Sequence, residues 1–220
     1  MALPESFCNL PVLEELNLVY VVLRLPDKLG QLSALKKLRT HASCLPDSLG
    51  DLISLEELTI TGEGLQNLPA SIGRLQSLCF LHIEAGSLQS LPEELGSLSS
   101  LEYLEVNCQS IRTVPDSLGR VSTLRYLTLN TDASRLPDSL GDLISLKELT
   151  IKGEGLQSLP ASIGRLQSLR KLNIEAGSLQ SLPDLEGICE RIRTRRDHFG
   201  SVMLNGRYLV YNYDSPSPLH

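Results

Sequence analysis

Three aromatic residues form the pattern in this chain that is most able to bind another molecule. Phe80, Tyr103 and Tyr126 follow one another at intervals of 23 residues, which is the period of an internal repeat. Aromatic side chains on a polar surface favour contact with a protein, because they remove a large area from water at a small entropic cost. His82 and Glu105 lie two residues beyond the first two aromatics and could orient a partner. The same spacing is also typical of aromatics that only stiffen a sheet against cross-strand neighbours.

The chain lacks the side-chain groupings that catalysis or a cofactor would need. Its four histidines, at positions 41, 82, 198 and 220, have no nucleophile or carboxylate at a useful spacing. Its five cysteines, at positions 8, 44, 79, 108 and 189, do not have the spacing of metal ligands. Gly62-Glu63-Gly64 is only half of a dinucleotide fingerprint, and no Walker-type phosphate loop occurs. We therefore expect a non-enzymatic protein without a metal or cofactor.

A basic group of residues lies earlier in the chain. Lys36, Lys37, Arg39 and His41 fall within one short segment. The whole chain has a formal net charge of -6, which disfavours a general binder of nucleic acid or of anionic membranes. We expect the group to be a solvated strand face, with Lys37 and Arg39 forming part of the protein-binding surface.

An internal repeat provides the elements that position these side chains. A sequence motif recurs at intervals of 20 to 23 residues. It consists of Leu-Pro, a short polar segment, Leu or Ile, Gly and then Leu-x-x-Leu-x-x-Leu-x-Ile, and an earlier copy begins at Leu3. The seven later copies begin at Leu25, Leu45, Leu68, Leu91, Val114, Leu136 and Leu159. A fixed period of this size indicates a solenoid, in which each repeat buries its apolar side chains against its neighbours.

The repeat at 45–67 illustrates the expected local structure. Leu58 and Ile60 alternate with polar residues, which is the period of a β-strand. Pro46 and Gly50 suit the beginning and end of a short helical turn on the opposite side. The predicted inward set is Leu45, Leu49, Leu52, Leu55, Leu58, Ile60 and Leu65. Because neighbouring strands lie about 4.8 Å apart, the three aromatic residues should form one contiguous stripe.

The repeated phrase resembles the leucine-rich-repeat family over residues 3–183. The resemblance implies an α/β fold, namely a right-handed solenoid of about eight repeats of 20–23 residues, with a parallel β-sheet on the concave side and short helices or turns on the convex side. The Leu-Pro-x-x-Leu-Gly-x-Leu motif resembles the repeats of two intracellular branches of the family. These are the plant nucleotide-binding disease-resistance receptors and the Ras-group scaffold proteins. The Asn or Cys that the family usually places after the strand is replaced, by Val21, Ser43, Glu63, Gly86, Gln109, Asp132, Glu154 and Gly177. This departure favours the resistance-receptor branch.

Part of the repeat array is duplicated. Residues 45–92 recur at 136–183 with six differences. Three of these differences fall on predicted outward strand positions: Thr61 against Lys152, Phe80 against Lys171, and His82 against Asn173. Such positions are a small share of the segment, so the concentration of change favours a binding role for the concave face. Ordinary drift of surface residues is the alternative.

The two ends of the chain differ in pattern. Leu185, Ile188 and Ile192 have the spacing of a short amphipathic helix, and Asn205-Gly206 is a favoured hairpin turn. We therefore expect a solenoid over 1–183, a helix-plus-hairpin cap over 184–213 and a disordered tail over 214–220. Because the chain starts inside a repeat, we expect it either to be a piece of a longer protein or to have a first repeat that is frayed or covered by a partner.

The cysteines and the first residues favour a cytoplasmic protein. No cysteine cluster seals an end, the N-terminus lacks the layout of a signal peptide, and the most apolar run is too short to span a bilayer. The combined prediction is a non-catalytic module that binds a protein ligand (an effector, guardee or signalling protein) on its concave sheet in plant-type innate immune signalling. A stand-alone Ras-group scaffold and the substrate-recognition part of a ubiquitin ligase are the alternatives.

Overall fold

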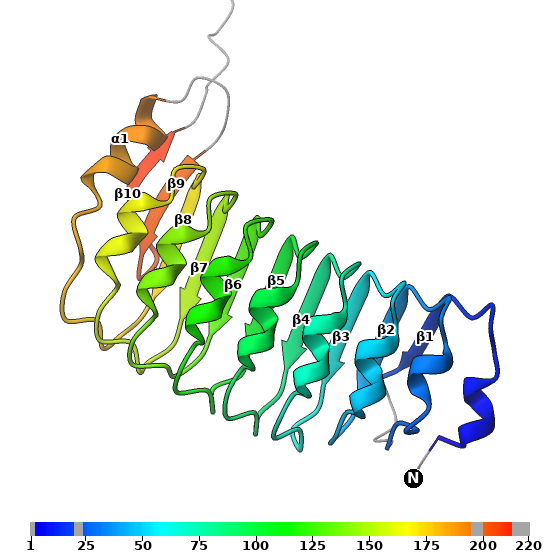
Figure 1. Cartoon of the computed structure of the whole chain (residues 1–220). Coiled ribbons are helices and arrows are strands. Elements are labelled where there is room, and N and C mark those ends of the chain that lie inside the picture. The colour runs from blue at the N-terminus through cyan, green and yellow to red at the C-terminus, as the bar shows by residue number, and fades with distance from the viewer. Residues whose placement is uncertain (1–2, 20–23, 195–199, 213–220) are drawn as a thin grey trace, which may run out of the picture.

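The computed structural model describes residues 3–19, 24–194 and 200–212, which form one stack of similar repeats (Figure 1). Each repeat places a β-strand on one side of the stack and a 3-10 helix on the other. The repeat strands are β1 (Glu15–Leu18), β2 (Lys37–His41), β3 (Glu57–Thr61), β4 (Phe80–Glu84), β5 (Tyr103–Asn107), β6 (Tyr126–Asn130), β7 (Glu148–Lys152) and β8 (Lys171–Glu175). The 3-10 helices are η1 (Glu5–Cys8), η2 (Leu29–Gln31), η3 (Asp47–Asp51), η4 (Ala70–Arg74), η5 (Glu93–Ser97), η6 (Asp116–Arg120), η7 (Asp138–Asp142) and η8 (Ala161–Arg165).

The strands form a single ten-stranded sheet in the order of the sequence. The repeat strands pair in parallel, and the register places equivalent residues of successive repeats side by side, as where Phe80 pairs with Glu57 on one side and with Tyr103 on the other. This parallel sheet, with short helical turns on the convex side, confirms the predicted leucine-rich-repeat solenoid.

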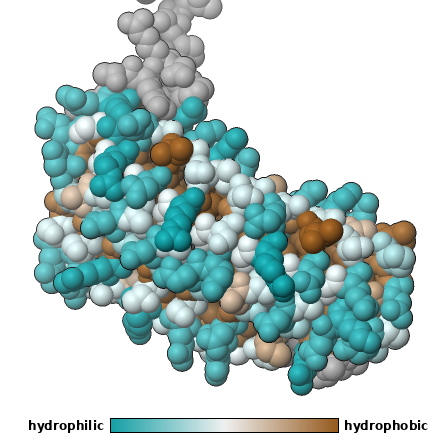
Figure 2. All heavy atoms as spheres, viewed as in Figure 1, coloured by the Kyte–Doolittle hydropathy of each residue, from teal (hydrophilic) through white to brown (hydrophobic). Residues whose placement is uncertain are grey.

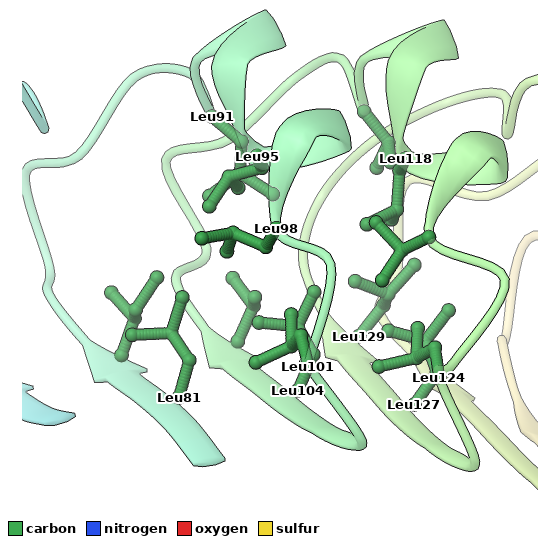
Figure 3. Close-up of a cluster of buried hydrophobic side chains, with 14 of the residues drawn as sticks. Leu81, Leu91, Leu95, Leu98, Leu101, Leu104, Leu118, Leu124, Leu127 and Leu129 are labelled. Carbon is green, nitrogen blue, oxygen red and sulfur yellow. The ribbon is translucent and has the colours of Figure 1, made fainter. Parts of the chain in front are cut away.

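Leucine side chains fill the space between the sheet and the 3-10 helices (Figure 3). Leu95 and Leu98 on the helical side face Leu104 and Leu127 on the strands, and all four are almost completely buried. In the repeat at 45–67, six of the seven predicted inward residues are fully buried. Leu45 is the exception and is only partly buried. The repeat that precedes it is shorter and has no counterpart of Leu65 to cover it.

Backbone groups continue the hydrogen-bond ladder beyond the strand ends, where this chain lacks the family's usual side chain. The N–H of Ala42 donates to the carbonyl of Thr61 (3.2 Å), and the N–H of Cys108 donates to the carbonyl of Asn130 (2.9 Å). The backbone N–H of the residue that follows these strands is therefore satisfied by the next repeat.

The C-terminal segment forms a helix and a hairpin. Helix α1 spans Glu186–Thr194, and β9 (Gly200–Leu204) pairs antiparallel with β10 (Arg207–Asn212). Strand β9 also pairs in parallel with β8, so the hairpin extends the main sheet by two strands. The tail predicted over 214–220 lies outside the described residues, as does the last residue of the predicted hairpin.

Asn205, in the hairpin turn, closes the ladder at the last repeat. Its Oδ1 accepts a hydrogen bond from the N–H of Ala176 (2.9 Å), and its own N–H donates to the carbonyl of Ile174 (2.7 Å). Asn205 has a φ of 46°, a left-handed conformation that asparagine tolerates better than most residues. The side chain of Asn205 therefore accepts the hydrogen bond that the N–H of Ala176 would otherwise make to a further repeat.

Successive 3-10 helices on the convex side pack too closely for a side chain on their glycines. A Cβ atom on Gly50 would clash with the carbonyl oxygen of Ser71, and one on Gly119 would clash with that of Ser139. Glycine is therefore required here by close approach of two backbones.

Candidate functional site

The three aromatic residues form the predicted stripe across the middle of the concave sheet. Phe80 on β4 pairs in register with Tyr103 on β5, which pairs with Tyr126 on β6. The rings of Phe80 and Tyr103 are stacked, with centroids 4.7 Å apart and an interplanar angle of 13°. The rings of Tyr103 and Tyr126 are 6.1 Å apart and tilted by 35°. The alignment expected from the repeat period is thus confirmed, and we call these three residues the aromatic stripe.

Glu105 holds the central ring of the aromatic stripe. Its carboxylate accepts a hydrogen bond from the hydroxyl of Tyr103 (3.0 Å) and another from the side-chain amide of Asn107 (3.0 Å). Nδ1 of His82 lies 3.2 Å from the same carboxylate. The structure therefore brings together His82 and Glu105 as predicted, and adds Asn107, which the sequence did not single out. With three partners, this carboxylate orients the tyrosine rather than standing free for a ligand.

The protonation states of Tyr103 and Glu105 suit this hydrogen bond. Burial by itself raises the pKa of Glu105, but hydrogen bonds from Asn107 and Tyr103 and the nearby His82 outweigh it, so the pKa lies below its ordinary value. Burial, followed by the hydrogen bond to Glu105, raises the pKa of Tyr103. At neutral pH the glutamate is therefore the acceptor and the phenol is the donor.

Ion pairs border the aromatic stripe on both sides. Glu57 on β3, beside Phe80, binds Nζ of Lys37 at 3.0 Å, and Glu148 on β7, beside Tyr126, binds Nζ of Lys171 at 2.9 Å. Each glutamate next to the stripe is thus neutralised by the lysine on its far side. The stripe is an aromatic surface set between two neutral polar borders.

The predicted basic group does not behave as one cluster. Lys36 pairs with Glu14 at 3.0 Å, and Lys37 pairs with Glu57, whose hydrogen bond raises the pKa of Lys37 above its ordinary value. Arg39 on β2 is exposed and makes no ion pair with another described residue. Of the two predicted contact residues here, Arg39 has a free charge and Lys37 does not.

The hairpin adds a part of the concave face that sequence reasoning missed. Met203 on β9 lies beside Asn173 on β8 and opposite Tyr208 on β10, and all three line a hollow of about 350 Å³ together with Glu148 and Lys171. The Asn205-Gly206 turn predicted a hairpin that covers the last repeat, but it did not predict that the hairpin strands extend the concave face. The alternation of Met203 with Val202, which is buried, is the sequence pattern that could have indicated a strand of the main sheet.

The described residues contain neither a metal-binding cluster nor a helix that could span a membrane. No group of three or more His, Cys, Asp or Glu side chains could hold a metal ion in this part of the chain. Burial raises the pKa of Cys108 to about 11, so its thiol is protonated at neutral pH and is a poor nucleophile. Within the same residues, no helix has the length and apolar character needed to cross a bilayer.

Comparison with protein families identifies the repeat. Residues 39–116 and 107–199 match the model of the leucine-rich repeat region. The chain belongs to the leucine-rich-repeat family. A comparison with the curated proteins gives no match.

Several solved structures share this fold. One from Leptospira interrogans is 31% identical with a TM-score of 0.74, over 87% of this chain and 49% of that chain. The leucine-rich repeat domain of the type III effector XopL is 21% identical with a TM-score of 0.70, over 92% of this chain and 72% of that one. The plant peptide hormone receptor RGFR1, solved in complex with RGF2, is 22% identical with a TM-score of 0.57, over 79% of this chain and 34% of the receptor. This chain therefore spans about half the length of the Leptospira protein.

Proposed function

We propose that this leucine-rich-repeat chain is a non-catalytic module that binds a protein ligand on its concave sheet, centred on Phe80, Tyr103 and Tyr126. The observation that carries the proposal is the aromatic stripe, because three partly exposed rings stand in contact on a face that is otherwise polar. A large aromatic surface whose central ring is already held by Glu105 binds a partner with little loss of side-chain entropy. His82 and Arg39 lie close enough along the sheet to add polar contacts.

The convex face offers less to a partner. Figure 2 shows that face covered mainly by hydrophilic residues, with only small, separate hydrophobic spots. Scattered apolar residues of this kind are normal on a protein surface, whereas contiguous ones mark interaction sites. The RGFR1 structure is a complex of a plant peptide hormone receptor with RGF2, which supports a polypeptide ligand for this chain as well.

For the biological setting we propose plant-type immune signalling in the cytoplasm, on the strength of the Leu-Pro-x-x-Leu-Gly-x-Leu phrase and the missing asparagine. The flanking gene sequence tests this part of the proposal. A nucleotide-binding domain upstream supports it, a ubiquitin-ligase domain downstream favours substrate recognition, and an isolated repeat array favours a Ras-group scaffold.

The binding face is tested with two matched triple variants of the whole chain. Phe80, Tyr103 and Tyr126 are changed together to Ala in one, and the exposed convex residues Asp47, Asp116 and Asp138 are changed to Ala in the other. Each is used as bait in extracts of the source cell, and bound proteins are quantified by mass spectrometry. We expect a specific partner to be lost from the first bait only. Equal loss from both, or from neither, contradicts the proposal.

A further inference from the structure

A polar groove follows the ends of the strands, next to the aromatic stripe. Its N-terminal section, of about 770 Å³, is lined by Thr61, Glu63, Glu84, Asn107, Asn130 and Asp132 among others. Its C-terminal section, of about 530 Å³, is lined by Lys152, Glu154, Glu175 and Asn205 and shares Asn130 and Asp132 with the first. The two sections are therefore continuous and run across the strands from β2, where His41 lines the groove, to β8.

The groove has more carboxylates than cations to neutralise them. Its basic groups are used within the protein, because Arg112 binds Asp132 at 3.2 Å, Lys152 binds Glu175 at 3.0 Å, and Nδ1 of His41 lies 3.1 Å from the hydroxyl of Thr61. Glu84 has no Lys or Arg within ion-pair distance among the described residues, and its side chain is 67% exposed. Its nearest basic group is Nε2 of His82, at 3.9 Å.

The duplicated segment shows what the N-terminal section lacks. Thr61 pairs with Glu84 across β3 and β4 in the register in which Lys152 pairs with Glu175 across β7 and β8. The C-terminal section thus has a lysine that neutralises its glutamate. In the N-terminal section a threonine stands there, and its hydroxyl lies 3.1 Å from Nδ1 of His41 and donates to the carbonyl of Thr40 (3.3 Å). The lysine that neutralises Glu175 in the second copy therefore has no counterpart beside Glu84 in the first copy.

Side-chain amides next to Glu84 add further hydrogen-bond acceptors. Asn107 donates its amide N–H to Glu105 at 3.0 Å, so its Oδ1 can accept a bond from a ligand. Asn130 pairs with Asn107 across β5 and β6, and its side chain makes no hydrogen bond to another described residue. A carboxylate flanked by amide oxygens matches the ammonium of Lys or the guanidinium of Arg, which only donate.

We propose that the N-terminal section of this groove, at Glu84, Asn107 and Asn130, takes a Lys or Arg side chain of the partner that covers the aromatic stripe. This inference rests on the proposed function. Phe80 and Glu84 lie on one strand, four residues apart, which corresponds to about 13 Å at the usual rise of a strand. An extended partner segment with an apolar residue and a Lys or Arg four positions away spans that distance.

The test is selection of peptides from a displayed library of random linear sequences, with the whole chain as target. Thr61→Lys supplies the lysine of the other copy, and Lys152 shows that the position accommodates it. Ala70→Lys, on the exposed start of η4, is the control with the same charge change on the convex side. We expect enriched peptides to pair an apolar residue with Lys or Arg four positions away. Thr61→Lys should weaken their binding by about tenfold or more, as expected for loss of one charged hydrogen-bonded contact, and Ala70→Lys should leave it unchanged.

The outcomes separate this inference from the proposed function. Peptides that require the aromatic stripe but show no preference for Lys or Arg overturn this inference alone. Equal weakening by Ala70→Lys also overturns it, because the effect is then one of net charge. If no enriched peptide depends on Phe80, Tyr103 and Tyr126, the proposed function fails as well. Lys152→Thr offers a gain of function, since it frees Glu175 and should strengthen the preference for cationic residues.

Discussion

Residues 45–92 and 136–183 build the same structure from nearly the same sequence but present different concave surfaces. Strands β3 and β4 in the first copy have the same bounds as β7 and β8 in the second, after the shift in numbering, and so have the 3-10 helices. On the convex side even the side-chain contacts recur, because Arg74 binds Asp51 at 3.1 Å as Arg165 binds Asp142 at 2.8 Å.

The concave contacts of the two copies differ at two of the changed positions. Phe80 stacks on Tyr103, whereas Lys171 in the equivalent position binds Glu148. Thr61 leaves Glu84 without a cation, whereas Lys152 binds Glu175. The scaffold therefore tolerates either surface, and the difference between the copies lies in what each can bind. The first has an open aromatic and acidic surface, and the second has satisfied its charges internally.

The largest expected effect tests whether the two copies are the same scaffold. Leu81 and Leu172 are equivalent and fully buried. Leu81→Ala and Leu172→Ala should each lower the free energy of unfolding by about 2–5 kcal/mol, because each leaves a cavity in a close-packed core. Urea denaturation followed by circular dichroism measures both. A difference between them of more than about 1 kcal/mol would show that their surroundings are not equivalent.

Exchange of the concave residues should separate binding from stability. Phe80→Lys removes the stack on Tyr103 and should cost about 1 kcal/mol of stability, while the introduced lysine can bind Glu57 as Lys171 binds Glu148. The affinity for the partner should fall by about thirtyfold or more, the loss typical of an interface anchor. Calorimetry of the purified partner with the Phe80→Lys chain gives the second quantity. Ala70→Lys, on the exposed convex start of η4, adds the same charge and is the control that should leave that affinity unchanged.

The smallest effect concerns the ion pair that only the second copy contains. Hydrogen bonds from Asn173 and Lys152 lower the pKa of Glu175 below its ordinary value of 4.5. A lowered pKa in the folded state gives stability that is complete above the ordinary value and is lost as the pH falls through the folded value. Lys152→Thr should therefore raise the pKa of Glu175, read by NMR titration of its carboxyl carbon. An unchanged midpoint would mean that the pair does not persist in solution.

The repeat period was enough to predict the sheet, its core and the alignment of the aromatic stripe. Equivalent positions such as Phe80 and Tyr103 must become neighbours in a parallel solenoid, whatever the details of each turn. Leu45 was placed in the core for the same reason, yet it is only partly buried because the repeat before it is shorter. A prediction from period alone assumes that every repeat is complete.

Other features depend on contacts that no periodicity contains. The bond from Tyr103 to Glu105 depends on the rotamers of two residues on one strand, and the sequence shows only that they are near. The role of Asn205 requires the hairpin to lie against the last repeat, so that its amide meets Ala176. The groove beside Glu84 required knowledge of which acids were already paired. Each of these features depends on how side chains pack in three dimensions.

The row of convex glycines has a consequence for the breadth of the binding face. A solenoid bends because its two sides repeat at different spacings, and the turns at Gly50 and Ser71 lie so close together that a Cβ atom on Gly50 would clash. The outer arc is then only a little longer than the inner one, and the stack is a shallow, open bow (Figure 1). A folded protein can lie flat against several strands of such a bow at once, so the aromatic stripe and the acidic groove can touch one partner together.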